Sequence, residues 1–173
     1  MKILVVSDTH GSLRGLQAAI KAEGKLDWIL HMGDVDRQED ELAALAGRSM
    51  FACVKGNNDY YSQLSNELLL DIRGYKIWMT HGHRYQVYSG NDMIKNVGIM
   101  KGADIIMYGH THSPLVEIDK ENKITVINPG SISQPRQLGR QPSYIVMEIE
   151  EGKTPSYEIK YLDKELAVRS FWF

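Results

Sequence analysis

The amino-acid sequence predicts an α/β fold that begins with a parallel sheet and continues with a second group of strands, and three observations lead to this interpretation. In the N-terminal third of the chain, β-branched runs alternate with helical periods, as in parallel strands joined by right-handed crossovers. After residue 113 the helical period disappears, and short strand patterns alternate with turn residues. The length of 173 residues, of which 43% are hydrophobic, fits a single domain spanning residues 1–173.

The first predicted unit is a strand followed by a helix. Residues 3–6 form a β-branched run, which is typical of a strand buried on both faces. We expect Ser12 to cap the following helix, in which apolar residues recur at helical spacing until Gly24 ends it. The unit repeats with a strand over 28–32 and a helix over 39–46 that Gly47 closes.

A third strand over 50–54 completes the parallel part of the predicted sheet. Because the carboxyl ends of parallel strands meet at one edge, we expect a crevice there. Beyond it, the pattern predicts a hairpin around Gly74, a helix over 89–100 and a strand over 104–108. The remaining predicted strands, which could build a second sheet, cover residues 116–118, 124–127, 144–149 and 156–161.

Charge and composition exclude several classes of function. The formal net charge of -2 offers no global positive field, so tight binding to duplex nucleic acid is not expected. The apolar run over 3–6 is too short for a signal-peptide core or a membrane span, so we expect a cytoplasmic protein without a membrane partner. The single cysteine, Cys53, lies in an apolar run and is interpreted as a buried structural residue.

Polar motifs follow the predicted strand ends. Each motif alone also fits a turn or a solvated loop, but five of the six histidines fall at three strand ends. Imidazole, carboxylate and amide groups gathered at one rim predict a metal site. The residues concerned are Asp8, His10, Asp34, Asn57, His81, His83, His110 and His112.

The ordered motifs D-x-H, G-D, G-N-N-D, H-G-H and G-H-x-H, which extend from residue 8 to residue 112, resemble the signature of the calcineurin-like metallophosphoesterases. The short chain and the N-P-G-S motif at 128–131 are similar to the small YfcE-type phosphodiesterase branch. The resemblance implies a four-layer α-β-β-α sandwich of two mixed sheets with flanking helices, with the metal site at the rim formed by the strand carboxyl ends.

The resemblance also implies a binuclear metal centre. One metal ion would be bound by Asp8, His10 and His112, the other by Asn57, His81 and His110, and Asp34 would bridge them. The mixed oxygen and imidazole set suits two divalent ions, with manganese expected and nickel, zinc, iron or cobalt as alternatives.

The activity implied by this centre is hydrolysis of small phosphodiesters, by attack of a metal-bridging hydroxide on phosphorus. Asp34 would be catalytic through its bridging position. A phosphomonoesterase or nuclease with the same metal centre is an alternative. A protein-interaction scaffold that keeps the fold is another, although all seven ligand positions hold residues able to bind metal.

One position departs from the superfamily pattern. Asn58 stands where many members have a histidine that assists the leaving group, and an amide cannot act as a general acid. We therefore expect substrates whose leaving group needs little help. His83 is the candidate for donating a proton or hydrogen bond, or else for orienting His81. Both Asn58 and His83 are assigned to substrate binding.

Several residues outside the proposed ligand set also have expected roles. His31, inside an apolar strand, is expected to be structural, and Asp59 either orients a rim histidine or makes a turn. The proline-fixed turn at 128–131 could present backbone donors beside the site. Arg136 and Arg140 are candidates for binding substrate phosphate. The apolar residues 171–173 pack on the body or form a dimer contact, so a homo-oligomer remains open.

Overall fold

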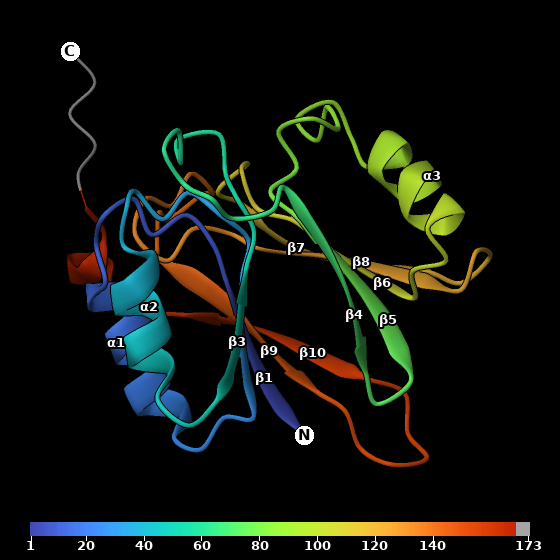
Figure 1. Ribbon diagram of the computed structural model, residues 1–173, viewed down its shortest axis with the longest axis horizontal. Coiled ribbons are helices and arrows are strands. Elements are labelled where there is room, and N and C mark those ends of the chain that lie inside the picture. The colour runs from blue at the N-terminus through green and yellow to red at the C-terminus, as the bar shows by residue number, and fades with distance from the viewer. Residues whose placement is uncertain (169–173) are drawn as a thin grey trace.

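The computed structural model describes residues 1–168, which form a four-layer α/β/β/α sandwich (Figure 1). The predicted contact of residues 171–173 lies outside the described residues. One sheet has the strand order β10-β9-β1-β2-β3 and the other has the order β4-β5-β6-β8-β7. The helices are α1 (Arg14–Glu23), α2 (Glu39–Ala46) and α3 (Asp92–Met100), and a short 3-10 helix covers Lys164–Leu166.

The first sheet begins as the sequence predicts. The strands β1 (Lys2–Val6), β2 (Trp28–His31) and β3 (Met50–Cys53) are parallel neighbours. The strand β9 (Ser143–Glu148) pairs antiparallel with β1, and β10 (Ser156–Tyr161) pairs antiparallel with β9. The expectation that these last strands belong to the second sheet is therefore wrong.

The reason lies in the burial of β9, whose first five residues are all buried. Ile145 and Met147 contribute to the apolar layer between the sheets, while Tyr144 and Val146 pack beneath α1 and α2. A strand that is apolar on both faces is stable only where both faces are covered, and the place beside β1 covers both.

The second sheet contains a hairpin and a parallel centre. The strands β4 (Glu67–Ile72) and β5 (Tyr75–Thr80) pair antiparallel around Gly74 as predicted. Arg73 and Gly74 have φ values of 56° and 84°, the positive values of a tight two-residue hairpin turn. The remaining strands are β6 (Ile105–Met107), β7 (Pro114–Asp119) and β8 (Ile124–Pro129), of which β6 and β8 run parallel to β5.

The two sheets pack face to face through buried aliphatic side chains such as Val5, Leu30, Met79 and Ile127. The outer face of the first sheet is covered by α1 and α2, and the outer face of the second by α3 (Figure 1). Each sheet is thus buried on both faces, which accounts for the continuous apolar runs of the central strands.

The helix boundaries differ from prediction mainly at their beginnings. Gly24 and Gly47 follow α1 and α2 with positive φ, as predicted. Ser12, however, does not cap α1: the helix begins at Arg14, and the Ser12 amide donates to the Thr9 carbonyl in the preceding turn at 2.9 Å. The third helix begins at Asp92 because residues 81–91 form the loop that leads away from β5.

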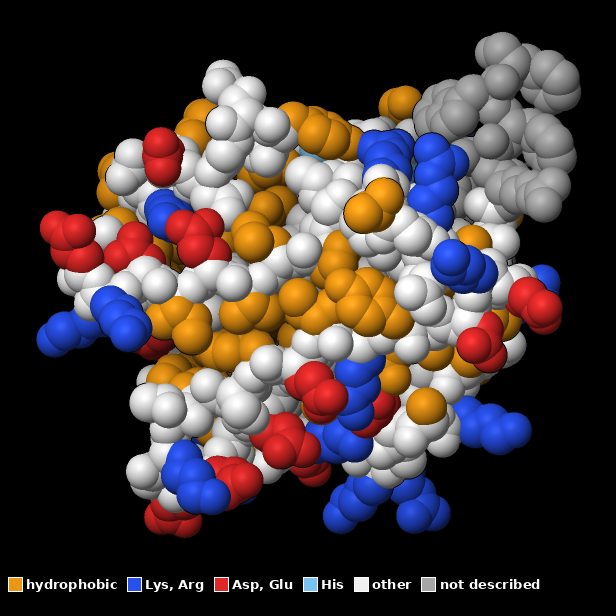
Figure 2. All heavy atoms as spheres, turned by 180° about the vertical axis from the view of Figure 1, so that it is seen from behind, with side chains coloured by type: hydrophobic (Ala, Val, Ile, Leu, Met, Phe, Trp, Pro, Cys, Tyr) orange, Lys and Arg blue, Asp and Glu red, His pale blue; other side chains and the backbone are white. Residues whose placement is uncertain are grey.

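The burial of Cys53 and the mixed charge of the surface agree with what the composition predicts. Cys53 is buried as predicted. Among the described residues, no helix is both long and apolar enough to cross a membrane. On the face opposite to Figure 1, hydrophobic side chains gather at the centre and charges of both signs lie around them, so this face is not uniformly basic (Figure 2).

Candidate metal centre

The carboxyl ends of β1, β2, β3, β5 and β6 lie at one end of the sandwich (Figure 1). The loops that follow these strands bring the seven predicted ligands together. Five of the seven have left-handed backbone conformations, an arrangement that costs free energy in non-glycine residues and is frequent at functional sites. These five are Asp8, His10, Asp34, His110 and His112.

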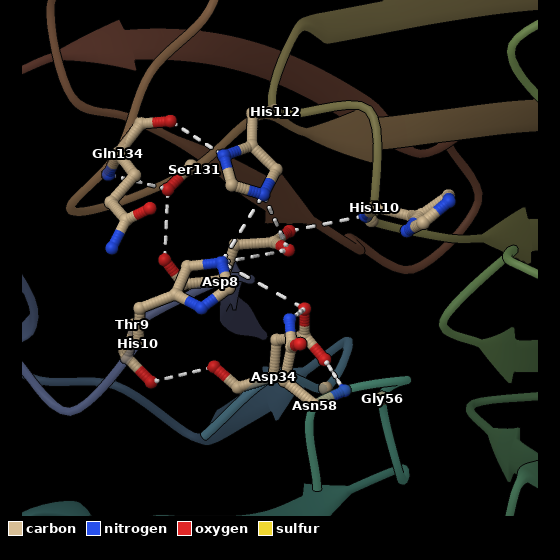
Figure 3. A network of polar contacts seen from close by, with 12 residues as sticks. Asp8, Thr9, His10, Asp34, Gly56, Asn58, His110, His112, Ser131 and Gln134 are labelled. Carbon is tan, nitrogen blue, oxygen red and sulfur yellow. Dashed lines mark hydrogen bonds and ion pairs between the residues drawn. The ribbon is translucent and has the colours of Figure 1, made fainter. Parts of the chain in front are cut away.

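The first cluster contains Asp8, His10 and His112 (Figure 3). Nε2 of His112 lies 3.1 Å from Oδ1 of Asp8 and 3.2 Å from Nε2 of His10. Nε2 of His10 lies 3.7 Å from the same Asp8 oxygen. Three potential ligand atoms therefore surround one point.

The second cluster is centred on His81, which is fully buried. Its Nε2 lies 3.0 Å from Oδ1 of Asn57 and 3.5 Å from Oδ2 of Asp34. The ring of His110 lies 5.1 Å from that of His81, measured between centroids. Asp8 adjoins this cluster too, because Asp8, Asp34 and His81 together could hold a metal ion.

Asp34 lies between the two clusters. Its Oδ2 is 3.8 Å from Nε2 of His10 and 3.5 Å from Nε2 of His81. Asn58 fixes this carboxylate, because its backbone amide donates to Oδ1 at 2.8 Å and its side-chain amide donates to Oδ2 at 2.6 Å (Figure 3). Asn58 thus positions Asp34, and its expected contact with substrate stays a prediction.

The hydrogen bonds of the histidines determine which ring nitrogen is free. Nδ1 of His81 donates to the Met32 carbonyl at 2.7 Å, and Nδ1 of His112 donates to the Gln134 carbonyl at 2.5 Å. In the neutral imidazoles each Nε2 then carries a lone pair. These lone pairs face other acceptors, and Oδ1 of Asp8 is buried without a hydrogen-bond donor. Opposed acceptors of this kind fit divalent cations.

The charges of the site shift its pKa values. Burial alone would raise the pKa of Asp8, but His112 and His81 hold it well below its usual range. Burial would lower the pKa of His81, yet the carboxylates of Asp34 and Asp8 raise it to about 9. Burial and the charge of His81 lower the pKa of His110 to about 4. His110 is therefore neutral at pH 7, as a metal ligand must be.

Asp59 organises the loop that carries Asp34. Its buried carboxylate accepts hydrogen bonds from the backbone amides of Asp34, Val35, Asp36 and Gly56 at 2.8–2.9 Å. Its hydrogen bonds go to backbone amides rather than to a rim histidine, which supports the turn-making interpretation. The loops after β2 and β3 are thus joined by one side chain.

The segment 128–131 donates hydrogen bonds to loops that carry candidate metal ligands. It was expected to present exposed backbone donors, but all four residues are buried. Asn128 instead donates to the Gly109 carbonyl at 2.8 Å, and Ser131 donates to the Asp8 carbonyl at 2.8 Å. Buried loop carbonyls need hydrogen-bond donors, and the side chains of Asn128 and Ser131 provide them.

Two further histidines lie close by. His31 is buried, accepts the Gly33 amide at 3.1 Å through Nδ1 and contacts the Thr9 hydroxyl at 3.3 Å, which confirms its structural role. His83 is half-buried, with its ring 5.5 Å from that of His81 and 6.1 Å from that of His110. Its Nδ1 is buried without a hydrogen-bond partner among the described residues.

A pocket of about 550 Å³ opens above the clusters. Besides His10, Asp34, Asn57, His110 and His112, its lining includes Asp36, Asn58, Tyr60, Tyr88, Gln134 and Arg136. Of the two predicted arginines, Arg136 lines this pocket, whereas Arg140 is not among its lining residues. Sequence motifs did not indicate Tyr60 or Tyr88, because single tyrosines in loops carry no spacing signal.

The chain resembles known proteins over most of its length. The sequence profile of the calcineurin-like phosphoesterase superfamily domain matches residues 1–152. The probable metallophosphoesterase YsnB of Bacillus subtilis is 34% identical over 151 residues, covering 87% of this chain and 85% of that protein. The phosphodiesterase YfcE of Escherichia coli K12 is 26% identical over 173 residues, covering 86% of this chain and 88% of that protein.

A solved structure from Streptococcus pneumoniae TIGR4, described as a predicted phosphoesterase, has the same fold. It superposes with a TM-score of 0.77 at 30% identity, covering 98% of this chain and 93% of that chain. This likeness agrees with the α/β architecture of the two five-stranded sheets.

Replacing the Asp59 carboxylate should destabilise the protein. An Asp59→Asn change places an amide group against buried backbone donors, so we expect the free energy of unfolding to fall by about 3 kcal/mol. Urea denaturation of metal-free protein measures this. Asp71→Asn is the matched control, because the exposed Asp71 accepts one backbone amide, from Gly74, and should lose less than about 1 kcal/mol. Equal losses in both variants would contradict the role of Asp59.

Metal binding should displace a proton from His81. At pH 8 a group with a pKa of about 9 is still protonated in about nine molecules of ten, whereas an ordinary histidine is neutral. Because proton and cation compete for Nε2, Mn²⁺ affinity should rise with pH up to about 9. Calorimetry at pH 8 in buffers of different ionisation enthalpy should report about one proton released. His83→Ala should leave this value unchanged, and a release near zero in the unmodified protein would refute the prediction.

Proposed function

Because this chain belongs to the calcineurin-like phosphoesterase superfamily, we propose that it is a binuclear metal-dependent phosphodiesterase that hydrolyses small phosphodiesters. The observation that carries the proposal is a pair of close contacts at the rim, in each of which an imidazole nitrogen faces an oxygen acceptor and a cation could take the place of the shared proton. Nε2 of His112 faces Oδ1 of Asp8 at 3.1 Å, and Nε2 of His81 faces Oδ1 of Asn57 at 3.0 Å. Two cations at these points would relieve both contacts.

In the proposed centre, Asp8, His10 and His112 hold one ion, and Asn57, His81 and His110 hold the other. Asp34 would bridge them, since its Oδ2 is within 4 Å of a histidine nitrogen in each cluster. The mixture of carboxylate, amide and imidazole favours a borderline divalent metal, with manganese as our first choice.

Two bound divalent cations would supply Lewis acidity, lowering the pKa of a water molecule and offsetting negative charge on the phosphoryl oxygens. The chain itself orients the ligands through the Met32 and Gln134 carbonyls, and Asn58 holds Asp34. Five ligand residues have a left-handed backbone, which directs their carboxylate and imidazole groups toward the centre.

We propose that His83 assists the leaving group. The amide of Asn58 is engaged by Asp34 and has no acidic proton, so it cannot perform this role. Burial, with the charges of His81 and Arg84, lowers the pKa of His83, so at pH 7 its neutral ring would act as a hydrogen-bond donor. Leaving groups of low basicity should therefore react fastest.

Two alternative functions rank below this proposal. A phosphomonoesterase or nuclease would use the same ligands, and only substrate comparison separates them. A protein-interaction scaffold needs no ligand set, whereas here every predicted ligand position holds a residue able to bind metal. The buried, unpaired Cys53 fits the proposed cytoplasmic location.

Asp34→Asn should abolish metal-dependent turnover. The amide removes a negative charge between the two clusters, so kcat/KM for bis(4-nitrophenyl) phosphate should fall by more than about a hundredfold in protein stripped of metal and reloaded with Mn²⁺. Asp71→Asn, at an exposed position near the end of β4, is the control and should keep its activity. Persistence of activity in Asp34→Asn would disprove the bridging role.

The diester preference and the role of His83 can be tested together. We expect bis(4-nitrophenyl) phosphate to be hydrolysed faster than 4-nitrophenyl phosphate. In His83→Ala, kcat should fall about tenfold for a diester with an alkyl leaving group but far less for the aryl diester, because the more basic alkoxide depends more on the hydrogen bond from His83. An equal fall for both diesters would remove the donor role. Faster hydrolysis of the monoester would favour a phosphomonoesterase.

A further inference from the structure

Exposed tyrosines gather beside the candidate metal centre. Tyr60, Tyr61 and Tyr88 are 75%, 76% and 61% exposed. The other strongly exposed tyrosine of the described residues, Tyr161, lies on β10. Aromatic rings left in water at the mouth of a pocket are typical of recognition surfaces, because a flat ring can cover them at little entropic cost.

Tyr88 is held in place against the centre. Its hydroxyl donates to the His110 carbonyl at 3.0 Å and accepts a hydrogen bond from the Arg136 guanidinium. Its ring lies 5.0 Å from that of His110 in an edge-on arrangement. The backbone amide of Arg136 in turn donates to the His112 carbonyl at 3.1 Å. The ring is thus fixed in orientation, while more than half of its surface stays free for a ligand.

Tyr60 stands on a different loop but lines the same pocket as Tyr88. It also lines an adjoining hollow of about 130 Å³, which contains Arg37 and Tyr61. The guanidinium carbon of Arg37 lies 4.7 Å from the centre of the Tyr61 ring. The pocket and the hollow share Asp36, Asn58 and Tyr60, so they adjoin each other at these residues.

The two loops belong to different sheets. Tyr60 follows β3 of the first sheet and Tyr88 follows β5 of the second, and both loops rise at the end of the molecule that carries the centre (Figure 1). Each tyrosine also has an arginine nearby: Arg136 contacts Tyr88, and Arg37 lies in the hollow that Tyr60 lines. The two rings therefore come from separately supported loops, and the two cations come from further loops, Arg37 after β2 and Arg136 after β8.

We propose that Tyr60 and Tyr88 stack on the two nucleobases of a dinucleotide whose scissile phosphate lies over the metal centre. The inference rests on the proposed phosphodiesterase function and names its substrate class. A diester carries a substituent on each side of phosphorus, and every nucleobase offers a flat face for stacking. Arg37 and Arg136 supply positive charge for the neighbouring phosphate or sugar oxygens.

The chemistry balances without a further reactant. Water adds to phosphorus, the bond from phosphorus to the leaving sugar oxygen breaks, and that oxygen takes one proton, so the products are a nucleoside monophosphate and a nucleoside. A sugar alkoxide is a poor leaving group, and Asn58 cannot protonate it. Recognition should therefore appear in KM, while kcat stays below that of an aryl diester.

The kinetic test uses the Mn²⁺-loaded full chain with two substrates, the DNA dinucleotide dApdA and methyl 4-nitrophenyl phosphate, which lacks bases. Tyr60→Ala and Tyr88→Ala should each raise KM for dApdA about tenfold or more relative to KM for the base-free diester. Tyr60→Phe and Tyr88→Phe keep the ring and should recover most of this difference. Tyr161→Ala, an exposed tyrosine on β10, is the matched control.

A binding measurement gives a second readout. 2-Aminopurine deoxyriboside 5′-monophosphate contains no diester bond, and its fluorescence is quenched when the base stacks on an aromatic ring. We expect the quenching by the unmodified protein to persist in the phenylalanine variants and to be lost in the double variant Tyr60→Ala/Tyr88→Ala.

Two results would overturn the inference while leaving the proposed function intact. One is an equal change in KM for both substrates, and the other is fluorescence quenching that survives removal of both rings. If the unmodified protein hydrolysed neither substrate with Mn²⁺, the proposed function would fail, and the inference would fall with it.

Discussion

The apolar layer between the two sheets holds together a site whose residues come from both of them. Asp8, His10, Asp34 and Asn57 follow strands of the first sheet, whereas His81, His110 and His112 follow strands of the second. Contacts such as those of Val5 and Leu30 with the layer that includes Met79 and Ile127 therefore fix the distance between the two halves of the site. Close packing of this kind resists small displacements, so it limits relative movement of the two groups of candidate ligands.

The rim loops satisfy their buried polar groups by a small number of shared contacts. Asp59 accepts four backbone amides and joins the loops after β2 and β3, while Ser131 and Asn128 join the loops after β1 and β6 to the end of β8. At the centre, Oδ1 of Asp8 has no hydrogen-bond donor, and the neutral imidazoles of His112 and His81 turn lone pairs toward carboxylate and amide oxygens. A cation between such opposed acceptors would satisfy both of them.

Around this fixed centre, the groups suited to recognise substrate lie on longer loops. The segment 81–91 carries His83 and Tyr88, and the segment after β3 carries Asn58 and Tyr60. These side chains differ in kind from the candidate metal ligands: they are half-buried or exposed, and they offer ring faces and hydrogen-bond donors. A division between a rigid reactive centre and recognition loops is common in α/β enzymes, since loops can change without disturbing the sheets.

The sequence alone determined the parallel strands, the hairpin at Gly74, the helix ends at Gly24 and Gly47 and the rim on which the polar motifs meet, because each depends on local patterns of period and turn chemistry. It also indicated the seven residues that the fold brings together. Only the tertiary structure decided that β9 and β10 return to the first sheet, since two-sided burial depends on the neighbouring layers. The same holds for Asp59, which binds amides distant in the chain, and for Tyr60 and Tyr88, whose shared pocket exists only once two sheets have packed. Local periodicity contains no information about such contacts, because they join loops of different sheets.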